Sequence, residues 1–136
     1  MTGWGIDYFH DDFRNSDGTT RILELWDQTL DRVFTAQEIN EALKKGSRRE
    51  ARQVVPSVDS SGHGTAVAGI AAGNGRESDG LYRGVAFESQ LLVVKLGVTN
   101  PLGFPRTTEL MRALDYVVRR AAKLGMPAAV NVSIGN

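Results

Sequence analysis

The chain has 136 residues, room for one domain at most, and its hydrophobic share of 41% and charged share of 24% are those of an ordinary soluble globular protein. Its 16 basic residues equal its 16 acidic ones, which argues against nucleic acid or an anionic membrane as partner. The sequence has no cysteine, no signal-peptide pattern and no apolar run of the roughly twenty residues that span a bilayer. Disulfides, thiolate chemistry and cysteine-built zinc sites are excluded, and the compartment stays open.

The first sixty residues predict a strand, a helix and a basic surface. Ile22–Trp26 is a short apolar, strand-like run. Thr35 and Glu38 form a capping box that predicts a helix to about Lys45, which Gly46 ends. A run of basic residues follows, most often a solvated face, with a processing site or a contact to an acidic partner as alternatives; we assign it no role. The run comprises Lys44, Lys45, Arg48, Arg49 and Arg52.

A histidine between two glycines opens a helix of small residues further along the chain. Residues 61–73 read SGHGTAVAGIAAG, with His63 in the Gly-His-Gly. A catalytic imidazole presents one ring nitrogen to a nucleophile and the other to an orienting acid, and flanking glycines leave room for both. A structural histidine in a core needs neither the glycines nor the alanines. The pattern therefore favours a catalytic role for His63.

The second half of the chain predicts two strands with a helix between them. Gln90–Leu96 and Ala128–Ile134 are apolar and β-branched, as buried parallel strands are. Residues 107–124 predict an amphipathic helix that Gly125 ends. Its buried face comprises Leu110, Leu114, Val117 and Ala121, and its solvent face Arg112, Arg119 and Lys123. With the helix at His63, this order predicts an α/β fold with a doubly wound, mostly parallel sheet.

The glycine-rich stretch does not fit a nucleotide site. A dinucleotide fingerprint would need a glycine where Ser78 stands, and it would need to follow a strand instead of a helix. A phosphate loop would need a lysine before Thr65. Both nucleotide interpretations fail.

Metal binding is also poorly supported. Asp59 and His63 lie four residues apart, but no second histidine shares their spacing, which leaves too few ligands for zinc. An acidic cluster near the N-terminus could supply an oxygen ligand to calcium, although a solvated turn that includes His10 fits it better. The cluster comprises Asp7, Asp11, Asp12 and Asp17. We assign no metal site and expect no cofactor to be required; calcium is possible but unsupported.

Three ordered blocks resemble the subtilisin-like serine peptidases, the subtilases. Residues 62–70 are similar to the histidine motif of the family, with Ala66 where a second histidine is frequent. Residues 84–95 are similar to the segment after the histidine helix, with Phe87 where proline is usual. Residues 130–135 resemble the strand along which these enzymes hold the peptide substrate.

This resemblance implies a fold and a chemistry. The expected fold is the subtilisin-like α/β fold, incomplete in this chain, and the expected reaction is endopeptidase cleavage of a peptide or protein substrate by acyl transfer. His63 is implied to be the general base. Ser133, Ile134 and Gly135 are implied to bind the substrate backbone by strand addition.

The triad of the family is incomplete in the printed sequence. Residues 5–8 and 12–13 resemble those that follow the catalytic aspartate, whose own position, two before Gly5, holds Gly3. The acid is therefore missing either through divergence or because the printed sequence starts late. Asp7 matches a later residue of the motif and is expected to point elsewhere. The oxyanion asparagine and a Gly-Thr-Ser with the nucleophile both follow the substrate strand in the family, and no Gly-Thr-Ser occurs here. We expect the chain alone to be inactive.

The stretch before His63 narrows the resemblance. Residues 20–58 are expected to be a longer insertion into a partial catalytic domain that spans residues 1–136, and residues 25–29 with the helix at Thr35 most resemble the clostridial spore-germination branch. Some members of that branch are active peptidases, and others have lost catalytic residues and serve in regulation. The alternative to a peptidase is therefore an inactive pseudoprotease that acts as a regulatory or peptide-binding module.

Overall fold

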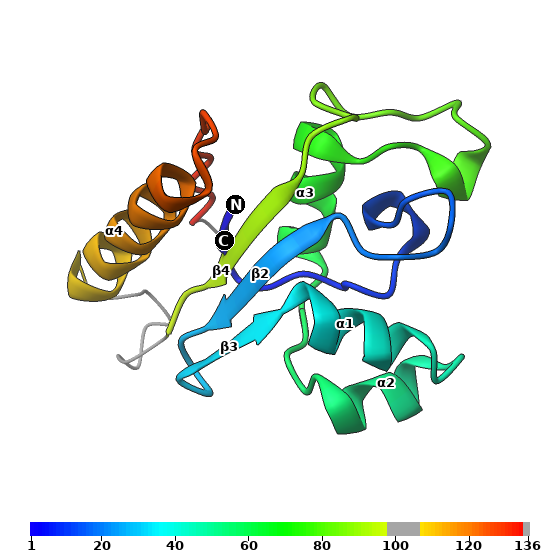
Figure 1. Ribbon diagram of the computed structural model, residues 1–136, viewed down its shortest axis with the longest axis horizontal. Helices are drawn as coiled ribbons and strands as arrows, with labels where there is room; N and C mark the ends of the chain where they lie inside the picture. The colour runs from blue at the N-terminus through cyan, green and yellow to red at the C-terminus, as the bar shows by residue number, and fades with distance from the viewer. Residues whose placement is uncertain (98–106, 135–136) are drawn as a thin grey trace.

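The computed structural model describes residues 1–97 and 107–134, and a four-stranded sheet forms the centre of that part (Figure 1). The strand order is β1-β4-β2-β3. The central strand β4 pairs in parallel with β1 and with β2, and β3 pairs antiparallel with β2 at the edge. The strands are β1 (Thr2–Gly3), β2 (Ile22–Asp27), β3 (Arg32–Thr35) and β4 (Leu91–Lys95).

Helices cover both faces of this sheet, as Figure 1 shows, with α4 on one side and α1 and α3 on the other. They are α1 (Ala36–Leu43), α2 (Arg48–Val54), α3 (His63–Ala72) and α4 (Thr107–Leu124), with short 3-10 helices η1 (Asp11–Phe13) and η2 (Arg76–Ser78). Along β4, Leu91 and Val93 join the core under α1 and α3, whereas Val94 joins the core under α4. The alternation of β4 side chains thus divides the interior into two layers, and the predicted doubly wound, mostly parallel α/β fold is confirmed.

Several local predictions are confirmed in the first hundred residues. The apolar runs form β2 and β4. Thr35 accepts a hydrogen bond from the Glu38 N–H (3.2 Å), and the Glu38 carboxylate accepts one from the Thr35 N–H (3.3 Å), which completes the capping box. After this helix Gly46 adopts a φ of +83°, a conformation that favours glycine. Ser47 then caps α2, a helix that was not predicted, by accepting from the Glu50 N–H.

The predicted buried face of α4 is correct only in part. Val117 and Ala121 are buried as predicted, but Leu110 and Leu114 are only half-buried, and Ala113 is fully buried instead. The three buried residues are spaced by four, so the line of contact follows one row of side chains along the helix. Alanine at its start lets the helix approach the sheet closely and leaves the leucines at the flanks. Arg112, Arg119 and Lys123 are exposed as predicted.

The predicted strand over Ala128–Ile134 is wrong in extent. The segment runs parallel to β1 but forms only one isolated bridge, between Thr2 and Val132. The Thr2 N–H donates to the Asn131 carbonyl and the Ser133 N–H donates to the Thr2 carbonyl, both at 3.0 Å. Because β1 has only two residues, it offers too short a ladder to define a longer strand beside it.

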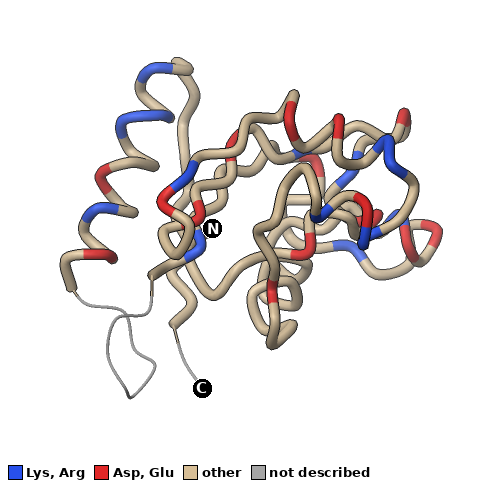
Figure 2. Tube along the Cα trace, turned by 90° about the horizontal axis from the view of Figure 1, so that it is seen from below, with Lys and Arg blue, Asp and Glu red and all other residues tan. Residues whose placement is uncertain are grey.

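The surface of the described part carries both signs of charge. Figure 2 shows basic and acidic residues following one another along α4, the helix beside the grey trace. No helix in residues 1–97 or 107–134 combines the length and the apolar character of a membrane span.

Candidate functional site

The first turn of α3 lies directly against the chain that leaves β1. A Cβ atom added to Gly64 would lie 2.0 Å from the carbonyl oxygen of Gly5, so no larger residue fits at this position without moving the backbone. The next residue fixes the same contact, because the Asp7 N–H donates to the Thr65 hydroxyl at 2.8 Å. The residue that opens this turn is His63. Glycine after the histidine thus sets the imidazole beside the segment that carries Gly3 and Gly5.

Asp59 holds the loop before His63 in place. Its carboxylate accepts hydrogen bonds from the Gly62 N–H (3.0 Å), the Thr65 N–H (2.8 Å) and the Thr65 hydroxyl (2.6 Å). Partial burial alone would raise the pKa of Asp59, but the hydrogen bonds from Thr65 and Gly62 outweigh it and hold the pKa below its usual value. Asp59 therefore caps the start of α3 and is not free to act as a metal ligand or as an acid toward the imidazole.

His63 itself is half-buried, and its Nδ1 atom is buried without a hydrogen-bond partner among the described residues. A buried polar atom in this condition is rare in proteins and calls for a specific reason. In serine peptidases the corresponding nitrogen donates to a carboxylate, which fixes the tautomer and orientation of the ring. The position expected to hold that carboxylate is occupied by Gly3.

Gly3 lies beside Ser133, one of the residues expected to bind substrate. A Cβ atom on Gly3 would lie 3.0 Å from the carbonyl oxygen of Ser133, a tight contact that a shift of a few tenths of an ångström would relieve. Ser133 is half-buried, and its hydroxyl donates to the Asn131 side chain at 3.3 Å. Ile134 is exposed, and Gly135 lies outside the described residues. The structure thus brings Ser133 next to Gly3, the position at which the sequence predicts the acid of the family.

The acidic residues near the N-terminus take part in local contacts. Asp7 pairs with Arg48 at 3.0 Å, so its carboxylate has a partner other than the imidazole, as expected. Asp12 accepts from the Glu77 N–H, and His10 caps η1 by accepting from the Asp12 N–H at 3.1 Å. Asp17 accepts from Thr19. In residues 1–97 and 107–134 there is no cluster of three potential metal-ligating side chains among histidine, aspartate and glutamate.

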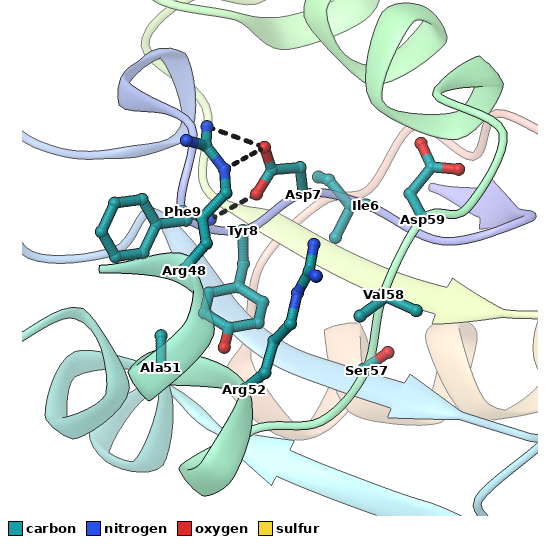
Figure 3. A pocket seen from close by; sticks show the side chains of 10 residues that line it. All are labelled: Ile6, Asp7, Tyr8, Phe9, Arg48, Ala51, Arg52, Ser57, Val58 and Asp59. Carbon is teal, nitrogen blue, oxygen red and sulfur yellow. Dashed lines mark hydrogen bonds and ion pairs between the residues drawn. The ribbon is translucent and has the colours of Figure 1, made fainter. Parts of the chain in front are cut away.

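Sequence reasoning missed two features near His63. Lys95, at the end of β4, donates from Nζ to the Val58 carbonyl at 2.7 Å and so ties the central strand to the loop before His63. A small pocket lies between that loop and α2, and Arg48 and Arg52 line it (Figure 3). Burial raises the pKa of Tyr8, at the floor of this pocket, to about 12, with its hydroxyl donating to the Val55 carbonyl. The Asp-Ser-Ser-Gly turn before the helix was a capping signal that could have identified Asp59.

Comparison with known proteins assigns the family. The sequence profile described as "Subtilase family" matches residues 4–136. The chain belongs to the subtilase family. Its backbone is also similar to the structure of the CspB protease of Clostridium perfringens, with a TM-score of 0.86 and 38% sequence identity. That match covers 98% of this chain and 28% of the CspB chain, so the residues present span little more than a quarter of that subtilase.

These matches confirm both levels of the sequence-based resemblance. The family is that of subtilisin-like serine peptidases, and the similarity to CspB confirms the resemblance to the clostridial spore-germination (Csp-like) branch. The half-buried His63 and the first turn of α3 are therefore part of a subtilase fold. Peptides or proteins are the class of substrate on which this family acts.

Proposed function

We propose that this chain is the histidine-bearing part of a subtilisin-like serine endopeptidase that cleaves peptide bonds by acyl transfer. The observation that carries the proposal is the placement of His63 at the first turn of α3, where Gly64 packs on Gly5 and Asp59 holds the preceding loop. A serine in a Gly-Thr-Ser turn is assigned to the remainder of the protein, since the chain spans 28% of the CspB protease chain. The 136 residues alone are expected not to turn over peptide.

The proposed chemistry moves one proton through His63. The ring accepts the proton of the serine hydroxyl as that oxygen attacks the peptide carbonyl, and then gives it to the departing amine. A water molecule then attacks the acyl-enzyme carbonyl while His63 accepts its proton, and His63 returns the proton to the serine oxygen as the acyl group leaves. The proposal requires no cofactor.

Substrate binding is proposed along residues 133–135. Ser133, Ile134 and Gly135 would pair with the backbone of an extended peptide, which reads main chain and tolerates many side chains. The hydrogen bond from the Ser133 N–H to the Thr2 carbonyl positions Ser133 beside β1 and Gly3 and commits that N–H to β1, so the peptide would pair with the remaining backbone groups of residues 133–135.

A peptidase assay on the full-length protein with single histidine variants tests the proposal. We expect hydrolysis of a fluorogenic peptide to fall at least about fifty-fold with His63→Ala, because triad members act as a unit and a site without its acid has less activity left for the histidine to supply. His10→Ala is the matched control, since His10 caps η1 and contacts the Phe13 ring, and its loss should leave the rate nearly unchanged. Equal hydrolysis by the wild type and His63→Ala would contradict the proposal.

One observation favours a second candidate, a pseudoprotease that binds peptide without cleaving it. The Nδ1 atom of His63 has no acceptor in the described residues, and Gly3 offers none. Loss of the acid lowers kcat of serine peptidases by about ten-thousand-fold, so a protein without it is a poor catalyst. Peptide binding with no turnover, unchanged by His63→Ala, would establish this candidate over the endopeptidase.

A further inference from the structure

A pocket of about 70 Å³ lies between α2 and the chain that leaves β1. Figure 3 shows Arg48 and Arg52 reaching it from α2, with Tyr8 between them and the loop of Val58 and Asp59 on the other side. Pockets for cofactors and drug-sized ligands have volumes of roughly 300 Å³ or more. A pocket of this size instead suits the tip of a single side chain.

Arg48 is already neutralised inside this pocket. Its Nε and terminal nitrogen lie 3.1 and 3.0 Å from the same Asp7 carboxylate oxygen, and its guanidinium stacks on the Phe9 ring at 5.2 Å. Arg14 stacks on the same ring at 4.4 Å. Arg48 therefore forms a fixed wall, and its charge is matched by that of Asp7.

Asp59, the second acid of the pocket, has its hydrogen-bonding capacity directed elsewhere. Its two carboxylate oxygens accept from Gly62, Ser61 and Thr65 at the start of α3. These donors hold it in its charged form, and it makes no ion pair in the described part of the chain.

Arg52, which is exposed, is the basic residue of the pocket whose guanidinium is open to a ligand. It follows Arg48 by four residues, so both project from the same face of α2. In Figure 3 its guanidinium points to the space between Tyr8 and Val58, and within the described residues it has no hydrogen-bond or ion-pair partner. A guanidinium presents a planar fork of donors that matches a carboxylate.

The pocket also lies within reach of the proposed peptide-binding edge. Gly5 packs on Val58, since an added Cβ atom would lie 2.7 Å from the Val58 carbonyl oxygen. Ile6, which lines the pocket, is three residues from Gly3, a separation of at most about 10 Å. Gly3 in turn lies beside Ser133. An extended peptide advances about 3.3 Å per residue, so a side chain a few positions along a peptide at Ser133 can reach the pocket.

We propose that this pocket is a specificity subsite that takes an acidic side chain of the bound peptide, with Arg52 as the partner of its carboxylate. The inference rests on the proposed function, because it needs a peptide along residues 133–135. Under this proposal one residue of the basic run, Arg52, contacts an acidic partner. The stretch 20–58, which we propose is an insertion, would then supply the selectivity.

Matched peptides and one pair of variants test this subsite in the full-length protein. Each position on either side of the cleaved bond is changed in turn from Gln to Glu, and both hydrolysis and binding of the labelled peptides are measured. We expect Glu to be preferred about five-fold at one position, as a partly exposed ion pair allows, and less at high salt. Arg52→Gln should abolish the preference, and Arg52→Lys should retain part of it. Arg49→Gln is the matched control, because Arg49 is exposed on the same helix and does not line the pocket.

The outcomes separate the subsite from the proposed function. If peptides are cleaved or bound with no preference for Glu at any position, or if the preference survives Arg52→Gln, the subsite is wrong and the peptide site stands. If the wild type neither cleaves nor binds any peptide, the proposed function fails and the subsite fails with it.

Discussion

At the scale of single residues, Gly64 is the position where one added carbon atom would disturb the candidate site most. A Cβ there would lie 2.0 Å from a backbone oxygen of Gly5, which no side-chain rotation can relieve. We expect Gly64→Ala to destabilise the protein by about 3 kcal/mol or more in urea unfolding. Gly69→Ala on the same helix meets nothing within 4 Å, and it should leave stability unchanged or raise it by up to about 1 kcal/mol. Similar losses for both variants would show that the contact is misplaced.

Asp59 gives a pH-dependent test of the loop before His63. Because its folded pKa lies below the usual value, the carboxylate stabilises the fold above the unfolded pKa of about 4 and loses this contribution as pH falls through the folded value. Asp59→Asn should therefore cost about 1–2 kcal/mol at pH 7, through the loss of charge-assisted hydrogen bonds. The difference from the wild type should shrink as pH falls below about 4. A difference that stays constant down to pH 2 would contradict this role.

Much of the candidate site could be predicted at this scale, and the reason for the exceptions is physical. The Gly-His-Gly pattern and the glycine at the expected position of the acid are local in sequence, so the sequence alone proposes His63 and Gly3 as site positions, and their roles stay predictions. Arg52 could not be identified in this way. The environment of Arg52 depends on which chain segments pack against α2, and on the ion pair that Arg48 forms with Asp7. The basic run itself specifies neither.

At the scale of elements, α4 offers a direct test of the observed buried row. Val117 is buried against Val94 and Trp26, whereas its neighbour Val118 is 60% exposed. We expect Val117→Asp to cost several kcal/mol, about 3 to 5, because it leaves an unpaired charge in the core. Val118→Asp should change stability by less than about 0.5 kcal/mol. Thermal unfolding of the two variants measures this difference. Equal losses of stability would mean that the buried row is assigned to the wrong face of α4.

The elements that sequence patterns predicted well are those with local signals. The capping box of α1 and the apolar runs of β2 and β4 were predicted because each is specified by adjacent residues. The segment 128–134 has the apolar composition of a strand but finds only the two residues of β1 beside it. Strand extent depends on the neighbour, and that information is not carried by the segment itself.

At the scale of the whole molecule, large apolar side chains lie exposed on the far side of α3. Ile70 and Val85 are 73% and 87% exposed, and they adjoin each other because the Val85 N–H donates to the Ile70 carbonyl. Leu81 and Tyr82 are also more than 70% exposed. Patches of this kind favour association.

We therefore expect the isolated 136-residue polypeptide to self-associate in sedimentation equilibrium. Replacing Ile70 and Val85 together by lysine should reduce association, because both side chains leave the apolar patch without disturbing the core. A clean monomer for the unmodified polypeptide would contradict this expectation.

The central proposal is that His63 is the general base of a subtilase site in which Gly3 occupies the position of the orienting acid. The most direct measurement is kcat of the full-length protein on one peptide, compared with Gly3→Asp and with the steric control Gly3→Ala. We propose that a carboxylate at this position accepts a hydrogen bond from the unpaired Nδ1 of His63, so we expect Gly3→Asp to raise kcat by at least about a hundred-fold, and the gain to vanish when His63→Ala is added. Gly3→Ala should give no gain, because it adds only the tight contact with Ser133. Unchanged or lower activity in Gly3→Asp, with the fold intact and Gly3→Ala tolerated, would contradict the account.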